Sequence, residues 1–352
     1  MYTGAEDAPQ FAFTSRLPEK PPADFGLVDF TLSTKPIREW VPWMEEKYRA
    51  SVEVAEALDD DTVPMARANT GTHVFAQAFG CDVHQPDDNQ PFALPLVHSP
   101  EEADKLTVPD IWSTPCLYRV FELADAVRER LGKDVWLGPC DMQTGFDIAC
   151  LIWEKVEILC AMTDPEQATS VKRLAAKCGR LMRTFLKELQ KEFPQMMLCG
   201  CPSVWTPPEL GPWPSNDECG AVNVEMFEEF MLPELIEISR DFGSVGMHCC
   251  ADADHQFPSF RNIPNFYAFN RVPPPGTGPD GFAAAVSELG GPDGPVFVNF
   301  GAQEELVRYF IDNAPRGTRA IFHASIGELD EGRTQLARNR EIVGSGSGNK
   351  VP

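Results

Sequence analysis

A short stretch at residues 244–255, SVGMHCCADADH, gathers side chains that bind metal ions. His248 and Cys250 are two positions apart, so in a regular strand both side chains point to one face, with Cα atoms roughly 6.5–7 Å apart. Imidazole nitrogen and thiolate sulfur bind zinc at about 2.0 and 2.3 Å, so this pair is able to reach a common ion. Cys249 then faces the opposite side. The alternative is that all three are core residues of a buried strand.

A catalytic zinc keeps three protein ligands and one open position, so the pair needs a third ligand. His323, at the end of the last predicted strand, is the first candidate, and Cys201 and Cys140 are the alternatives. The competing interpretation of His323 is a histidine hydrogen-bonded to backbone. His255 is expected to support the ligands through hydrogen bonds or to face solvent. The remaining histidines lie in a segment rich in Pro and Asp and are expected to be exposed: His73, His84 and His98.

Seven apolar runs of strand length alternate with amphipathic helical stretches. The predicted strands cover residues 63–69, 134–140, 196–201, 244–250, 265–270, 295–300 and 318–325. The predicted helices cover residues 36–58, 115–131, 148–162, 165–192, 223–241, 280–290, 302–314 and 332–343. Such alternation indicates βα units and a parallel sheet. Seven or eight units over roughly 290 residues favour an α/β fold of the closed (β/α)₈ barrel type over an open doubly wound sheet.

The domain organisation follows from the same pattern. Residues 1–35 are rich in Pro, Asp and Phe without a sustained period, and we expect an irregular N-terminal arm. Residues 36–345 are predicted to form a single barrel domain. Residues 346–352 have the composition of a flexible tail.

Composition narrows the class of partner. The chain has 352 residues, of which 43% are hydrophobic, and its 30 basic and 53 acidic side chains give a net charge of −23. Such a charge disfavours binding to nucleic acid or to an anionic membrane and leaves a small molecule as the expected ligand. Neither an apolar run of about 18 residues nor a signal peptide is evident, so we expect a cytoplasmic protein. Eleven cysteines are then reduced thiols. The oligomeric state stays open.

In a barrel of this type the active site lies at the carboxyl ends of the strands, so polar residues that follow the apolar runs are candidates. We assign substrate binding to Asn69, Asn270, Arg271 and Asn299. Asp141 and Glu218 are candidate catalytic carboxylates that hydrogen-bond to the substrate or donate a proton to it. The alternative for both carboxylates is a helix cap or a solvated surface position.

The stretch VNVEMFEEFMLPELIEISRDFGSVGMHCCADADHQF resembles the uroporphyrinogen decarboxylase superfamily. In that superfamily a Phe-rich helix containing Pro leads into a strand that ends in His, any residue, Cys. AQAFGCDVHQPDDNQPF is similar to the segment ahead of the first barrel strands, WLGPCDMQTGFDIACLIW to a Gly-Pro loop with its following helix, and MTDPEQATSVKRLAAKCGRLMRTFLKELQ to a helix that starts with DPE. The resemblance extends over about residues 36–345.

The resemblance implies one of two chemistries. The decarboxylases need no cofactor and hold the carboxylates of a porphyrinogen with arginines near the first strand; KPIREWVPWMEEKY contains Arg38 but lacks the Arg-rich signature. The corrinoid-dependent methyltransferases carry zinc on His-x-Cys and a later Cys. His248 and Cys250 match the first two of these ligands. No Cys follows Cys250, and His323 falls near the expected third position.

The function that this resemblance implies is a zinc-dependent methyltransferase. It would move a methyl group between a small substrate, such as an O-methyl compound, and a corrinoid (cobalamin) cofactor carried by a partner protein. The alternative is a metal-free decarboxylase of a carboxylated ring compound, for which Arg271 and Arg38 are the candidate arginines. A third hypothesis is a non-catalytic binding protein that keeps the barrel.

Overall fold

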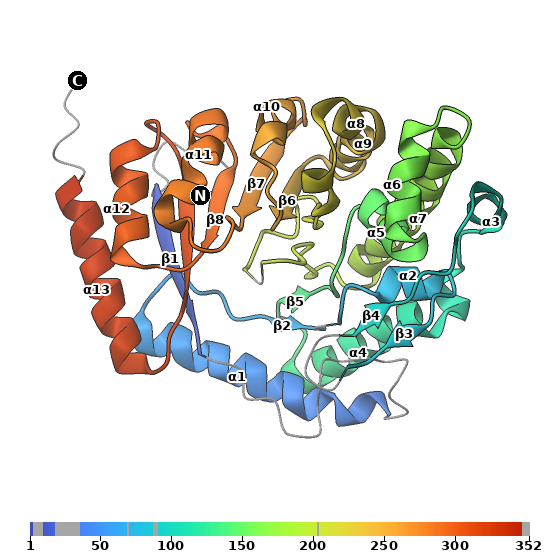
Figure 1. Cartoon of the computed structure of the whole chain (residues 1–352). Coiled ribbons are helices and arrows are strands. Elements are labelled where there is room, and N and C mark those ends of the chain that lie inside the picture. The colour runs from blue at the N-terminus through green and yellow to red at the C-terminus, as the bar shows by residue number, and fades with distance from the viewer. Residues whose placement is uncertain (3–9, 18–35, 69, 87–90, 203, 347–352) are drawn as a thin grey trace.

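The computed structural model describes residues 1–2, 10–17, 36–68, 70–86, 91–202 and 204–346. Its fold is a (β/α)₈ barrel, and Figure 1 shows helices outside the strands. In chain order the strand positions are β1 (Phe11–Arg16), β2 (Ala66–Arg67), β5 (Leu137–Gly138), the segment 196–199, β6 (Val245–Cys249), β7 (Phe266–Arg271), β8 (Val296–Phe300) and β9 (Ala320–Ser325).

The strands are arranged in a ring of parallel neighbours. Five strands form one continuous parallel sheet in the order β1-β9-β8-β7-β6, and β2 pairs with β5 in a second sheet. Single parallel bridges continue from β5 to the segment 196–199, from there to the loop 212–216, and from that loop to β6. On the other side, the amide of Asp61, just ahead of β2, donates to the carbonyl of Phe13 in β1 at 2.8 Å. These contacts join the two sheets.

Strand β1 corrects the expectation of an irregular segment over residues 1–35. Phe11–Arg16 pairs in parallel with Ala320–Ser325 at six consecutive positions, so residues 11–16 supply the eighth strand. Phe13 stacks on Phe322 with ring centroids 5.6 Å apart. This short strand is stabilised by a partner at the far end of the sequence, and local periodicity gives no sign of such a partner.

The helices agree with the predicted pattern at most positions and differ at two. The longer ones are α1 (Val41–Leu58), α4 (Pro115–Leu131), α7 (Ala168–Glu192), α12 (Glu304–Asn313) and α13 (Leu329–Gly346). The predicted helix 148–162 is two helices, α5 (Gly145–Ile152) and α6 (Lys155–Thr163), and the predicted helix 223–241 is α8 (Val224–Phe230) followed by α9 (Leu232–Phe242). Pro233 in the first turn of α9 explains the second break, because proline is tolerated at a helix start and not inside it.

Shorter elements complete the structure. They are β3 (Val83–His84) paired with β4 (Phe92–Ala93), the helices α2 (Val74–Ala78), α3 (Pro100–Lys105), α10 (Phe257–Phe260) and α11 (Ala283–Leu289), and the 3₁₀ turns η1 (Ile37–Glu39), η2 (Ile111–Ser113), η3 (Glu218–Ala221), η4 (Asp254–Gln256) and η5 (Gly278–Phe282). None of the described helices combines the length and the apolarity that a bilayer crossing requires.

Alternation along the strands separates an inner core from an outer one. Met197, Ala268, Val298 and Ile321 belong to one buried cluster that fills the inside of the barrel. Phe297 faces the other way and packs against Phe310 of α12. Because side chains alternate, the residues two positions beyond the inner ones point into the barrel at its carboxyl-terminal end.

Candidate metal centre at the barrel mouth

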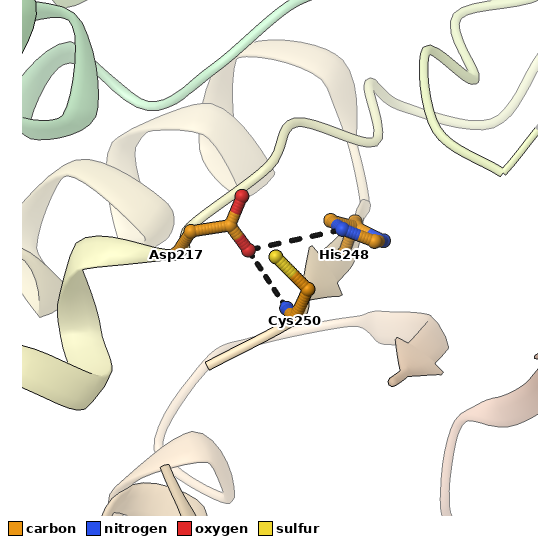
Figure 2. Close-up of side chains that lie close together, drawn as sticks. All are labelled: Asp217, His248 and Cys250. Carbon is orange, nitrogen blue, oxygen red and sulfur yellow. Dashed lines mark hydrogen bonds and ion pairs between the residues drawn. The ribbon is translucent and has the colours of Figure 1, made fainter. Parts of the chain in front are cut away.

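Three side chains with metal-binding atoms meet at the end of β6 (Figure 2). The ligand atoms of Asp217, His248 and Cys250 all lie within 4.8 Å of one another. His248 Nε2 is 3.8 Å from Asp217 Oδ1, which also accepts the backbone N–H of Cys250 at 2.7 Å. Neighbouring ligand atoms on a tetrahedral zinc lie about 3.3–3.8 Å apart, so the group fits zinc after small side-chain movements. His248 is buried and Cys250 is exposed, which leaves one side of the centre accessible.

A hydrogen-bond chain fixes the orientation of the His248 ring. Asn270 of β7 donates from Nδ2 to the carbonyl of Val298 at 2.5 Å, and its Oδ1 lies 2.5 Å from His248 Nδ1. An amide held in this way presents an acceptor to the ring, so Nδ1 keeps its proton and Nε2 is the nitrogen that gives up its proton when a metal ion binds. Nε2 faces Asp217. Metal-binding histidines are commonly held by such a partner on the second ring nitrogen.

The position of Asp217 is set from outside the centre. Asp147 of α5 is buried and accepts the backbone N–H of Asp217 at 2.6 Å and that of Glu218 at 3.3 Å. The amide of Asn216 donates to the carbonyl of His248 at 2.9 Å. Burial raises the pKa of Asp147 well above its usual range, and the carboxylates of Asp217 and Glu218 add to this effect. The loop is therefore tied both to α5 and to the strand that carries His248.

The pKa values of His248 and Cys250 are both raised, so both side chains keep their protons when no metal ion is bound. Burial lowers the pKa of His248, but contacts with the Cys201 and Cys250 thiols and with Asp217 outweigh it and raise this pKa to about 12. The contact with His248 lowers the pKa of Cys250, but burial and the Asp217 carboxylate outweigh it, so this pKa is raised. A metal ion has to displace these protons, so its binding is coupled to pH.

His323, the first candidate for the third ligand, lies apart from His248 and Cys250. Among the residues described, Asp217 is the third side chain that lies close to this pair, and His323 is not part of the group. His323 Nδ1 lies 2.8 Å from Thr14 Oγ1, and burial, with Arg16, lowers the pKa of His323 to about 4. Phe300 is the strand neighbour of His323, and its ring centroid is 6.5 Å from that of His248. The two histidines are on strands separated by two others in the sheet.

The two alternative third ligands also lie outside the group. Cys201 Sγ is 3.5 Å from His248 Nδ1, the ring nitrogen that bonds to Asn270, whereas Asp217 faces Nε2. Cys140 is fully buried, and burial raises its pKa to about 12. Cys201 therefore lies at the ring nitrogen that is turned away from Asp217, and Cys140 is a core thiol.

The predicted catalytic carboxylates are both in ion pairs. Asp141 forms a salt bridge with Arg67 of β2, whose Nε also donates to the carbonyl of Pro139 at 3.1 Å. Glu218 pairs with Lys155 at the start of α6 at 2.8 Å. Glu218 is therefore turned to α6, and its neighbour Asp217 is the acid that faces the imidazole.

The predicted substrate-binding residues are dispersed. Asn270 is occupied at both ends of its amide by His248 and Val298. Arg271 is fully buried, with its guanidinium bonded to Asp254 at 2.8 Å and to the carbonyl of Ala251. Asn299 is buried. Its strand neighbour Val298 points into the barrel, so by alternation the side chain of Asn299 points outward, toward the helices. Asn69 lies outside the described residues.

The other histidines follow the prediction with one exception. His84 and His98 are exposed, and His255 is exposed with its Nε2 donating to the carbonyl of Val222 at 2.8 Å. His73 was expected to be exposed but has only 1% of its surface accessible, because it begins α2 inside the helical layer.

The closed ring of parallel strands with helices outside it places this protein among the TIM barrels. A His-x-Cys pair lies at the carboxyl end of one strand, where barrel enzymes have their active sites. Residues 55–269 match the family described as uroporphyrinogen decarboxylase (URO-D). This match spans more than half of the chain, and the chain belongs to that family.

Solved structures give the same fold. A methyltransferase from Methanosarcina mazei superposes with a TM-score of 0.59 at 12% sequence identity, and the match covers 90% of each chain. Bee venom hyaluronidase in complex with a hyaluronic acid tetramer covers 95% of this chain and 96% of its own at 10% identity, but its TM-score of 0.39 supports no argument. No curated protein matches the sequence at a significant level.

Sequence reasoning missed Asp217 because it follows no predicted strand. It lies in PSNDECG, in the extra loop between the segment 196–199 and β6. The sequence offered one local sign, the adjacent acids Asp217 and Glu218, and of these the prediction named Glu218 as a catalytic carboxylate.

Proposed function

We propose that this protein is a zinc-dependent methyltransferase that moves a methyl group between a small substrate, such as an O-methyl compound, and a corrinoid cofactor on a partner protein. One observation carries the proposal: Asp217, His248 and Cys250 converge at the barrel mouth, with the imidazole oriented by Asn270. Membership of the uroporphyrinogen decarboxylase family and the fold shared with a methyltransferase support it. Abundant free thiols are consistent with a cytoplasmic setting, which is part of the proposal.

In this proposal Asp217, His248 and Cys250 would hold the zinc. A zinc ion in such a site supplies Lewis acidity toward an ether oxygen, or binds a thiol as its thiolate. Asn270 keeps the Nε2 lone pair of His248 directed at the ion position. The exposed side at Cys250 leaves room for the substrate oxygen to approach.

The other polar groups at the mouth orient the substrate. Asp141 lies at the end of its strand in a salt bridge with Arg67, so its carboxylate is held in place and is able to accept a hydrogen bond. His323 is neutral near pH 7 because its pKa is lowered to about 4, so it adds no positive charge to the mouth.

Metal content and activity test the proposal together. Protein purified without chelator is expected to contain about one equivalent of zinc by elemental analysis, and His248→Ala is expected to retain less than about a tenth of it. His84→Ala, at an exposed histidine on β3, is the matched control and should keep both zinc and methyl transfer to cob(I)alamin. Wild-type protein with less than about a tenth of an equivalent, and with activity unchanged in His248→Ala, would refute the proposal.

The family description favours the decarboxylase alternative, but the two candidate arginines, Arg271 and Arg38, are not available to bind substrate carboxylates at the barrel mouth. Arg271 gives its guanidinium to Asp254 and Ala251, and Arg38 is exposed on η1, so these two residues do not form the carboxylate-binding cluster that this chemistry requires. Decarboxylation of a carboxylated ring compound by metal-free protein is the result that would favour it.

A further inference from the structure

A cavity of about 370 Å³ opens at the barrel mouth, between the loop 272–279 and the start of α12. Its walls are mainly apolar and include the proline run 273–275, Phe282, Leu306 and Phe300. Ligand pockets in proteins commonly have volumes of about 300–1,000 Å³ and apolar walls with few polar groups. This cavity lies at the carboxyl ends of β7 and β8, the face on which barrel enzymes bind their substrates.

The cavity and the metal centre share structural elements. Phe300 lines the cavity, and its ring centroid is 6.5 Å from that of His248. The loop that forms the other wall begins at Val272, whose amide donates to the carbonyl of Cys249 at 3.0 Å. Phe300 is 41% exposed, which is high for a phenylalanine at the end of a barrel strand. Phe300 therefore connects the cavity with the candidate metal centre, whose residues Asp217, His248 and Cys250 do not line the cavity themselves.

The charges around the cavity select against an anion. Of the described residues that line it, Arg271 is the one cation. Its side chain is 0% exposed, its two terminal nitrogens bond to Asp254 and to the carbonyl of Ala251, and its Nε is buried without a hydrogen-bond partner. Glu305 is exposed at the rim and contributes a negative charge, in a chain with a net charge of −23. A carboxylate or phosphate entering the cavity would lose water without gaining a counter-charge.

We infer that this cavity binds the methyl donor as an uncharged aromatic methyl ether, with its ring against Phe300 and the prolines and its methoxy group toward the metal centre. The role as methyl donor rests on the proposed function. A dry cavity of about 150 Å³ accommodates benzene, so 370 Å³ holds an aromatic ring with methoxy substituents. Aromatic rings pack favourably against the faces and edges of other rings, which Phe300 provides.

Two ligands that differ in charge test this inference by ligand-detected NMR or calorimetry on the full chain. Methoxybenzene is expected to bind at least tenfold more tightly than 4-methoxybenzoate. Glu305→Lys replaces the rim acid with a cation and is expected to tighten 4-methoxybenzoate about tenfold while changing methoxybenzene by less than twofold. This variant alters an exposed side chain, so it does not depend on repacking the core.

A cavity-filling variant tests the location. Gln303 is exposed and lines the cavity, so Gln303→Trp should weaken methoxybenzene at least tenfold. Gln85→Trp is the matched control next to β3, on the side of the molecule away from α12 in Figure 1, and should bind as the wild type does.

The outcomes separate this inference from the proposed function. Equal or tighter binding of 4-methoxybenzoate by the wild type, or unchanged binding in Gln303→Trp, overturns the inference. Protein that holds zinc and ignores methoxybenzene also overturns it and leaves the proposed function standing. Protein that binds methoxybenzene in a manner blocked by Gln303→Trp, yet holds no zinc, supports the cavity assignment and refutes the proposed function.

Discussion

Glu234 of α9 should make the stability of this protein depend on pH. Both of its carboxylate oxygens lie 2.8 Å from the backbone nitrogen of Gly145, where α5 begins, and its side chain is only 11% exposed. Burial raises its pKa from 4.5 to about 7, although the Gly145 amide and Arg183 oppose the change. Helix α5 also carries Asp147, which accepts the backbone N–H of Asp217, so Glu234 holds the start of the helix that supports the candidate metal centre.

The sign and magnitude follow from linkage. Below pH 4.5 Glu234 is protonated in both the folded and unfolded chains, and its contribution to stability is fully present. As pH rises toward 7 the unfolded chain ionises first, so the free energy of unfolding falls. A pKa rise from 4.5 to about 7 corresponds to a loss of about 3 kcal/mol, at about 1.36 kcal/mol per pKa unit.

Glu234→Gln removes this titration, and urea unfolding followed by tryptophan fluorescence measures its effect. The free energy of unfolding of wild type minus that of the variant should fall by about 3 kcal/mol between pH 4.5 and pH 8. Any hydrogen bond lost in the variant changes this difference in the free energy of unfolding by the same amount at every pH. Glu237→Gln, on the same helix and exposed, serves as the control and should change stability by less than about 1 kcal/mol. If the wild-type and Glu234→Gln stabilities change in parallel across this range, the reasoning about the buried carboxyl is wrong.

Other predictions concern the centre and its supports. Asn270→Ala should weaken zinc about 10–100-fold in chelator competition, because the His248 ring loses the partner on Nδ1; unchanged affinity would contradict this role. Asp147→Ala should lower the free energy of unfolding by about 1–3 kcal/mol and weaken zinc as well, since it leaves loop amides without their acceptor; stability loss with intact zinc binding would show that the loop is held by other contacts. Zinc affinity should rise with pH between 6 and 8, because binding displaces protons from His248 and Cys250, whose pKa values are raised; calorimetry in two buffers should detect proton release. Arg271→Ala should destabilise the fold by roughly 1–3 kcal/mol in urea unfolding, since it removes a fully buried side chain and leaves the carbonyl of Ala251 without its guanidinium donor; a loss below about 1 kcal/mol would show that these bonds contribute little.

Sequence patterns were sufficient to predict the barrel and two of the three side chains of the candidate metal centre. Buried parallel strands are continuous apolar runs, so β6 to β9 were predictable. The His-x-Cys spacing predicted that His248 in β6 and Cys250 directly after it lie close together. Family membership confirms the resemblance to the uroporphyrinogen decarboxylase superfamily. Whether these residues bind zinc stays a prediction.

The remaining features depend on contacts between distant parts of the chain. Asp217 reaches the centre because Asp147, 70 residues earlier, holds the backbone of its loop. His323 was plausible as a ligand because it ends a strand, but position along a strand does not specify which neighbours it faces. Asn270 illustrates the same limit, since its role depends on the carbonyl of Val298 on the adjacent strand.

The closure of the barrel through β1 has a consequence for biosynthesis. Thr14 and His323, which meet across β1 and β9, are 309 positions apart in the chain. During translation the first strand therefore waits for nearly the whole polypeptide before its partner leaves the ribosome, and its unpaired edge is meanwhile open to wrong pairing. Contacts of such long range make folding slow, so the final sealing of the ring is expected to come late and to be the stage at which chaperones matter most.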